Sequence, residues 1–146
     1  MKEKFIELFE YNLYFNEKLI HLIEPNLEKV PERLIQLINH ILSAHRVWNA
    51  RILSETPIHP WEMHPFEELI GMNSKNHQET FQILENPNLE TFISYQNTSG
   101  TNFQNKLEDI LFHVINHGTY HRGQIAMLFR ESGLTPMVSD FIAYKR

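Results

Sequence analysis

The longest stretch with helical periodicity, residues 107–131, constrains the fold of this 146-residue chain more than any other feature. Its apolar residues lie three and four positions apart, from Leu107 through Val114 to Phe129, which predicts an amphipathic helix. Gly133 follows as the expected residue of the C-terminal cap. We expect this helix to organise the domain.

Three further segments show helical periodicity, and prolines separate them. These segments are residues 5–23, 31–52 and 66–84. A proline is tolerated in the first turn of a helix but stops a helix interior. The prolines that bound the segments are Pro25, Pro31, Pro57, Pro60, Pro65 and Pro87. The third segment has a polar middle at residues 73–77, which weakens its apolar stripe.

A different pattern precedes the last helix. Aromatic and β-branched residues surround Gly100, which predicts a short extended or hairpin excursion near residues 91–103. Four helices with connections of moderate length predict an all-α fold, a four-helix bundle that forms one domain over residues 1–146. Such bundles commonly build metal sites from side chains on facing helices.

Composition excludes several kinds of function. The chain has no cysteine, so disulfides, thiolate metal sites and a cysteine nucleophile are excluded, and a metal must bind through His, Asp or Glu. A formal charge of -5 without a basic run argues against a nucleic-acid partner. Because neither a signal-peptide core nor a membrane-spanning apolar run is present, we expect a cytoplasmic protein without a membrane partner.

The chain has nine histidines, and His113, His117 and His121 recur every four residues in the last helix. Residues four apart lie on one helix face, so neighbouring members of this trio can aim at one point. Apolar residues flank the trio, and we expect it to face the interior. Buried imidazoles need polar partners, and one metal ion satisfies several of them at once.

One helix cannot easily supply all three ligands, because the first and third members of the trio lie roughly 12 Å apart along the axis. A further ligand must come from another helix. The second segment offers His40 and His45, and periodicity does not choose between them.

The run from Asn116 to Gln124, which reads NHGTYHRGQ, resembles the signature of the DinB family of bacterial metal-binding proteins. The resemblance extends upstream through residues 111–114 and downstream to residues 139–142. Residues 39–42, followed by Trp48, resemble the second helix of that family, and three residues resemble its first helix: Tyr11, Asn12 and Asn16.

The resemblance implies a four-helix bundle with a long crossover, usually as a homodimer. It implies a metal site formed by His40, His117 and His121, with His45 as the fallback and His113 close to the site without being a ligand. The implied cofactor is one divalent transition metal ion, zinc or nickel before iron or manganese.

Three histidines leave a coordination position for water or substrate, which favours catalysis. The family resemblance implies a metal-dependent transferase or hydrolase that acts with a small thiol or another small molecule. The alternative is a non-catalytic, metal-stabilised dimeric binding or stress-response protein.

Several neighbours could assist this site. Tyr120 and Gln124 flank the ligand residues, and Arg122 could pair with an anionic substrate or lie in a surface or interface salt bridge. A carboxylate could orient a ligand imidazole, and the candidates are Asp140 and Glu108. Two glycines in the helix, Gly118 and Gly123, suggest the close approach of another helix or of a partner.

Overall fold

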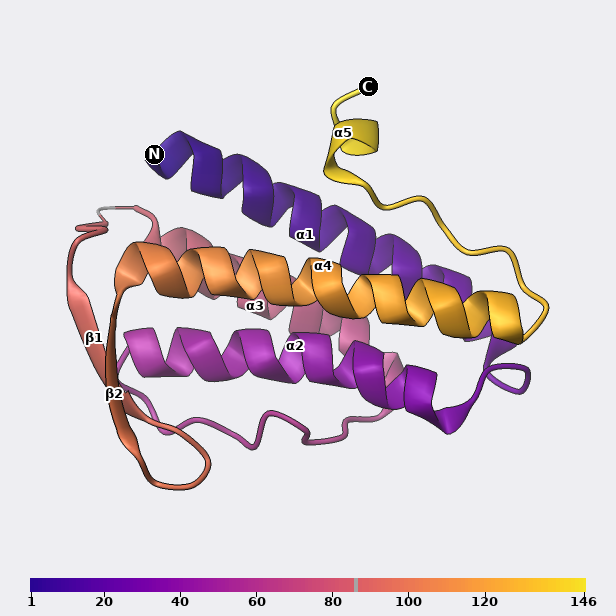
Figure 1. The fold of residues 1–146 in the computed structure, drawn as a ribbon, viewed down its shortest axis with the longest axis horizontal. Helices are drawn as coiled ribbons and strands as arrows, with labels where there is room; N and C mark the ends of the chain where they lie inside the picture. Colours follow the sequence, from indigo (N-terminus) through magenta and orange to yellow (C-terminus); the bar gives the residue numbers. More distant parts are fainter. Residues whose placement is uncertain (86) are drawn as a thin grey trace.

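The computed structural model describes residues 1–85 and 87–146, and in this part the chain is mostly helical (Figure 1). The long helices are α1 (Lys2–Ile23), α2 (Glu32–Ile52), α3 (Leu69–Ile83) and α4 (Leu107–Glu131). Short helical turns are η1 (Glu24–Asn26), η2 (Phe66–Glu68) and α5 (Phe141–Tyr144). Strands β1 (Phe92–Gln96) and β2 (Asn102–Lys106) pair antiparallel, which confirms the predicted hairpin excursion.

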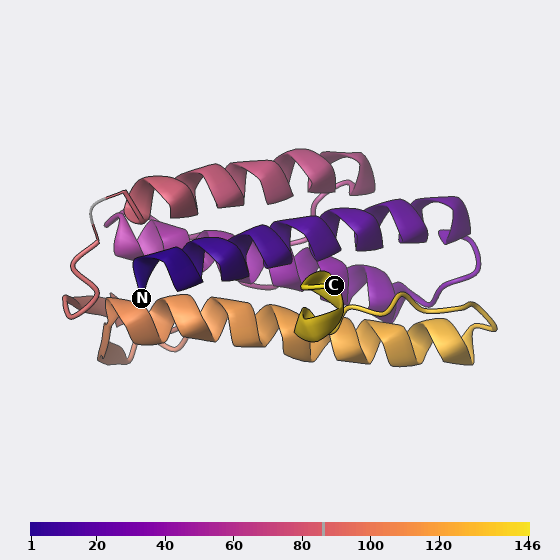
Figure 2. The same cartoon turned by 90° about the horizontal axis from the view of Figure 1, so that it is seen from above.

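The long helices pack side by side. Helix α2 contacts α3 and α4, and α1 contacts the same two helices. Figures 1 and 2 show that α1 and α4 run in one direction, whereas α2 and α3 run in the opposite direction. Since α2 and α3 are parallel, residues 53–68 must return along the length of the molecule to connect them.

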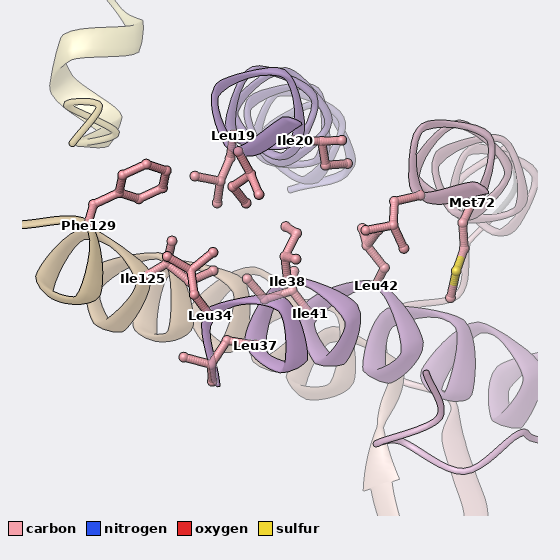
Figure 3. Packing of buried hydrophobic residues seen from close by; sticks show 12 residues of the cluster. Leu19, Ile20, Leu34, Leu37, Ile38, Ile41, Leu42, Met72, Ile125 and Phe129 are labelled. Atoms are coloured by element: carbon pink, nitrogen blue, oxygen red, sulfur yellow. The ribbon is translucent and has the colours of Figure 1, made fainter. Parts of the chain in front are cut away.

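The buried apolar residues form two clusters. One joins the C-terminal half of α1 to the N-terminal half of α2 and the end of α4, and side chains from all four long helices meet in it (Figure 3). The other joins the start of α1 to the start of α4 and includes Phe5, Phe9 and Leu111. Each cluster takes its apolar residues from the periodic positions that predicted the helices.

A layer of buried polar side chains lies between the two clusters along every long helix. Its members are Asn12, Asn16, Asn39, His40, Ser43, His45, Asn49, Asn73, Asn76, Thr80, His121 and Arg122. The polar middle of α3 belongs to this layer, and its amides are hydrogen-bonded: Asn73 donates to the Leu13 carbonyl at 3.1 Å and Asn76 to the Leu42 carbonyl at 2.9 Å. Hydrogen bonding offsets the cost of burying these groups.

The C-terminal segment returns across α1 (Figure 2). The Tyr11 hydroxyl donates to the Ser139 carbonyl at 2.7 Å, and the rings of Phe141 and Tyr144 pack edge-on against Tyr11. Among the described residues, no helix combines the length and the apolar character needed to cross a membrane.

Candidate metal centre

Three of the predicted site residues come together between α2 and α4. The Nε2 atom of His117 lies 3.0 Å from Nε2 of His40 and 3.1 Å from Nε2 of His121. His40 and His121 are buried, with exposed fractions of 7% and 8%, and His117 is half-buried. One ligand atom from each of the three lies within 4.8 Å of the others, so the group could hold a metal ion.

The hydrogen bonds of two of these imidazoles determine where their protons are. His40 Nδ1 lies 2.7 Å from the Pro60 carbonyl oxygen, and His121 Nδ1 lies 2.7 Å from Oε1 of Gln124. Because both oxygens accept hydrogen bonds, each Nδ1 carries the proton. In the neutral form, the Nε2 atoms of His40 and His121 therefore present lone pairs to His117.

The neutral form is favoured by the surroundings of all three rings. Burial, and after it the neighbouring His121 and His40, lower the pKa of His117 to about 3. Burial also lowers the pKa of His40 and of His121, although the hydrogen bonds to Pro60 and Gln124 act in the opposite direction. Neutral imidazole is the form that binds metal ions.

The donor set fits a transition metal better than it fits hydrogen bonding alone. A neutral His117 has a single ring proton and can donate it from Nε2 to only one of the two facing lone pairs. At least one pair of nitrogens therefore has no proton between them, although they are about 3 Å apart. One cation among the three nitrogens would satisfy every lone pair, and imidazole suits zinc, nickel, copper and iron.

The connection between α2 and α3 covers this cluster. The Trp61 ring stacks on the His40 ring, with centroids 3.6 Å apart and planes 5° from parallel, and Arg33 lies 4.9 Å from the centroid of the Trp61 ring. Ser43 Oγ donates to the Glu62 carbonyl at 3.0 Å, which holds the segment against α2. The sequence did not predict that the Pro60 carbonyl accepts a hydrogen bond from His40 or that Trp61 stacks on its ring. From the sequence, Pro60 is interpreted only as a residue that ends the second helix.

His45, the fallback ligand, lies elsewhere. Its Nε2 atom is 2.8 Å from the hydroxyl of Thr80 in α3, and its ring centroid lies 5.5 Å from that of Phe9 in α1. The ring is buried and does not belong to the cluster.

His113 differs from the other members of its trio. It is exposed, so the prediction that all three face the interior is wrong for this residue. Its ring lies 5.6 Å from that of His117 and lines a neighbouring hollow of about 240 Å³, together with residues such as Trp48 and Tyr95. Its position next to a ligand candidate is the one that the sequence implied.

Arg122 does not have the predicted role at the surface or toward a substrate. Its side chain is buried, with 2% exposed, and Nη1 donates to Asn12 at 2.9 Å and to Asn16 at 3.0 Å. It thereby links α4 to α1. A Cβ atom at Gly118 would lie 3.2 Å from Arg122 Nη1 and from Asn12 Oδ1, so a close approach is confirmed there, whereas Gly123 has nothing within 4 Å.

The carboxylates expected to orient an imidazole do not do so. Asp140 is exposed at the start of α5, and Glu108 lies at the start of α4, where its carboxylate is 4.0 Å from Lys106. The Gln124 amide and the Pro60 carbonyl hold the rings instead, so of the predicted helpers only Gln124 has that role. Tyr120 is 64% exposed, and its ring lies 5.0 Å from that of His121.

Helices that present three neutral imidazoles to one point define a helical protein with a candidate histidine metal centre. The chain belongs to the DinB family, whose sequence profile matches residues 1–146. It is similar to Protein DinB of Bacillus subtilis (strain 168), with 23% identity over 163 aligned residues that cover 99% of this chain and 95% of the relative. The family resemblance that residues 116–124 predicted is therefore confirmed.

Proposed function

We propose that His40, His117 and His121 bind one divalent transition metal ion, zinc or nickel before iron or manganese. The observation that carries this proposal is the convergence of lone pairs: oxygen acceptors hold the Nδ1 protons of His40 and His121, so both Nε2 atoms face His117 without a proton of their own. Partners that orient the ligands in this way are typical of protein metal sites.

We further propose that the architecture is a four-helix bundle with a long crossover at residues 53–68. Mutual packing of the four long helices and the parallel direction of α2 and α3 support it. In such a bundle, facing helices bring ligands together that lie far apart in sequence, as His40 and His117 do here.

The proposed activity is that of a metal-dependent transferase or hydrolase that uses a small thiol or another small-molecule substrate. A bound metal ion would lower the pKa of a coordinated water or thiol at a position that three histidines leave open. The chain itself positions the ligands through Gln124 and Pro60 and shields one face of His40 with Trp61. Because the chain has no cysteine, the thiol would have to come from the substrate.

The first test is metal content by elemental mass spectrometry on the purified protein. We expect about one zinc or nickel ion per chain, and a loss of most of it in His40→Ala and in His121→Ala. His113→Ala is the matched control, since it removes an imidazole from the same helix next to the cluster but should keep the metal. A metal content that does not change in His121→Ala would refute the site.

A second candidate function is a non-catalytic metal-stabilised binding protein. The observation that favours it is that the cluster joins α2 to α4, so a bound ion would connect two helices whether or not it turned over a substrate. Removal of the metal by a chelator distinguishes the two functions. Loss of a transferase or hydrolase activity supports the enzyme, whereas loss of thermal stability in a protein without such activity supports the binding protein.

We also propose that the protein is a homodimer and that nucleic acid is not a partner. The acidic net charge of -5 supports the second point. A filter-binding assay should show no tight, salt-sensitive affinity for DNA.

A further inference from the structure

The outer face of α4 carries large apolar side chains that no other part of the described chain covers. Phe112, Tyr120 and Met127 are 59%, 64% and 56% exposed. Figure 2 shows α4 along one edge of the molecule, and in Figure 1 no other helix lies in front of it. Large apolar residues gathered in this way on one face indicate an interaction surface.

These residues belong to a continuous stripe. Eight exposed positions of α4, which we call the α4 stripe, lie on this side: Asp109, Phe112, Asn116, Thr119, Tyr120, Gly123, Met127 and Arg130. The exposed residues His113 and Glu131 lie beside the stripe, at one margin. At about 100° and 1.5 Å per residue, the residues of the stripe occupy a sector of roughly 100° and a length of about 32 Å. The stripe is therefore as narrow as the seam between two packed helices.

The stripe is complementary to itself when a second copy runs antiparallel. With a two-fold axis between Thr119 and Tyr120, residue i lies level with residue 239 minus i of the other copy. Phe112 then meets Met127 of the partner subunit, and Asp109 meets Arg130 of the partner subunit. Asn116 lies opposite Gly123 of the partner subunit, where the missing side chain leaves space.

We propose that the α4 stripe is the surface through which two copies of this chain pair, with their α4 helices antiparallel. A two-fold contact must be self-complementary, and this register joins apolar to apolar at Phe112 and Met127 and acid to base at Asp109 and Arg130, with Asn116 opposite Gly123 and Thr119 opposite Tyr120 between them. A parallel pairing about the same face would place Asp109 against Asp109 and Arg130 against Arg130. This inference rests on the proposed homodimer and is independent of the metal site.

The first test measures molar mass by light scattering during size-exclusion chromatography. We expect the protein at twice its chain mass of 17.4 kDa, and Phe112→Glu at 17.4 kDa because the charge would lie against Met127 of the partner subunit. Val138→Glu is the control, since Val138 is 68% exposed outside the stripe and its replacement should keep the dimer. Unchanged helical circular dichroism and metal content would show that Phe112→Glu still folds.

The second test exchanges charges and asks whether the partners are the ones that the register predicts. Asp109→Arg or Arg130→Asp alone puts like charges together twice in each dimer, and we expect the dissociation constant to rise about fivefold or more. The double variant restores opposite charges, and its dissociation constant should fall back most of the way to that of the wild-type protein. A double variant as weak as the sum of the two singles would overturn the register.

The third test is disulfide cross-linking through introduced cysteines. Because the chain has no cysteine of its own, a disulfide can form only at the introduced position. In the antiparallel register, the two copies of residue 120 differ in level by about 1.5 Å, and those of residue 112 by about 22 Å. Tyr120→Cys should therefore form a disulfide-linked dimer with diamide, and Phe112→Cys should not.

Each remaining outcome has a definite meaning. Cross-linking of both variants would indicate the parallel arrangement and refute ours. A dimer that persists in Phe112→Glu without cross-linking at residue 120 would support the homodimer but refute the α4 stripe. A wild-type protein that is monomeric at high concentration would refute both, and the metal content would still test the metal site separately.

Discussion

Gly118 lies in α4 where the helix meets the Asn12 side chain of α1. Inside a helix, alanine is normally about 1 kcal/mol more favourable than glycine. Here the added methyl group would lie 3.2 Å from Arg122 Nη1 and from Asn12 Oδ1. These two atoms form a hydrogen bond of 2.9 Å in the layer of buried polar side chains. Neither atom can move away without weakening that bond.

We therefore expect Gly118→Ala to lower the free energy of unfolding by about 1 kcal/mol, because overpacking outweighs helix propensity. The matched control is Gly71→Ala in α3, where nothing lies within 4 Å of the added atom. That variant should gain up to about 1 kcal/mol. Urea unfolding measures both, and an equal gain for the two variants would contradict the close approach.

His45 makes stability depend on pH. Burial, and after it the nearby His77, lower its pKa to about 3, whereas the unfolded imidazole titrates near 6.5. Between these values the unfolded chain binds a proton that the folded chain does not. The free energy of unfolding therefore decreases as the pH falls from about 6.5 toward 3, by up to about 1.4 kcal/mol per pH unit.

In metal-free protein, we expect His45→Gln to reduce the slope of the unfolding free energy against pH by up to about 1.4 kcal/mol per pH unit, which corresponds to one proton. Thr80→Val is the control, because it removes the hydroxyl that bonds His45 but leaves the imidazole buried, so the slope should remain. Urea unfolding at several pH values measures it. If His45→Gln retained the wild-type slope, the group responsible would have to be another one.

At the scale of the element, two residues in the polar middle of α3, Asn73 and Asn76, pack inward, whereas Ser74 and Lys75 face solvent. The side-chain amide of Asn76 donates to the Leu42 carbonyl of α2 at 2.9 Å, and the backbone carbonyl of Asn76 accepts from the side-chain amide of Asn49 at 3.0 Å. The side chains of α3 thus replace apolar contacts with directional bonds to α2. A buried polar partner that loses its bond typically costs about 1–3 kcal/mol.

We expect Asn76→Ala to lower the free energy of unfolding by about that amount. Gln78→Ala is the comparison, since Gln78 is exposed in the same helix and its truncation should change stability by no more than about 0.5 kcal/mol. Guanidinium denaturation followed by circular dichroism measures both variants. Similar small effects for the two would mean that the layer contributes little to stability.

At the scale of the whole molecule, a metal between α2 and α4 would stabilise the folded state over the unfolded one. At a free metal concentration of 100 times Kd, binding contributes about 2.7 kcal/mol. Zinc or nickel should raise the Tm of the chelator-treated protein, as measured by scanning calorimetry. The Tm of His40→Ala should not respond, and that of His113→Ala should; a response in His40→Ala would place the metal elsewhere.

The sequence by itself determined the helices, because an apolar period of 3.6 residues bounded by prolines is a local property. A spacing of four residues also places His113, His117 and His121 on one helix face whatever surrounds them, and the family resemblance implied that the last two belong to the metal site. The hairpin near Gly100 followed from composition in the same way. All of these depend on residues that are close together along the chain.

Helical periodicity did not decide which residues join them: the family resemblance implied His40, and the tertiary structure places its ring beside His117. His40 and His45 are five positions apart and so point about 140° apart around α2, and only the packing of that helix shows that His40 faces α4 while His45 faces Thr80. The contacts of Pro60 and Trp61 depend on the path by which the connection returns along α2. Such contacts join residues far apart in sequence, and no local pattern encodes them.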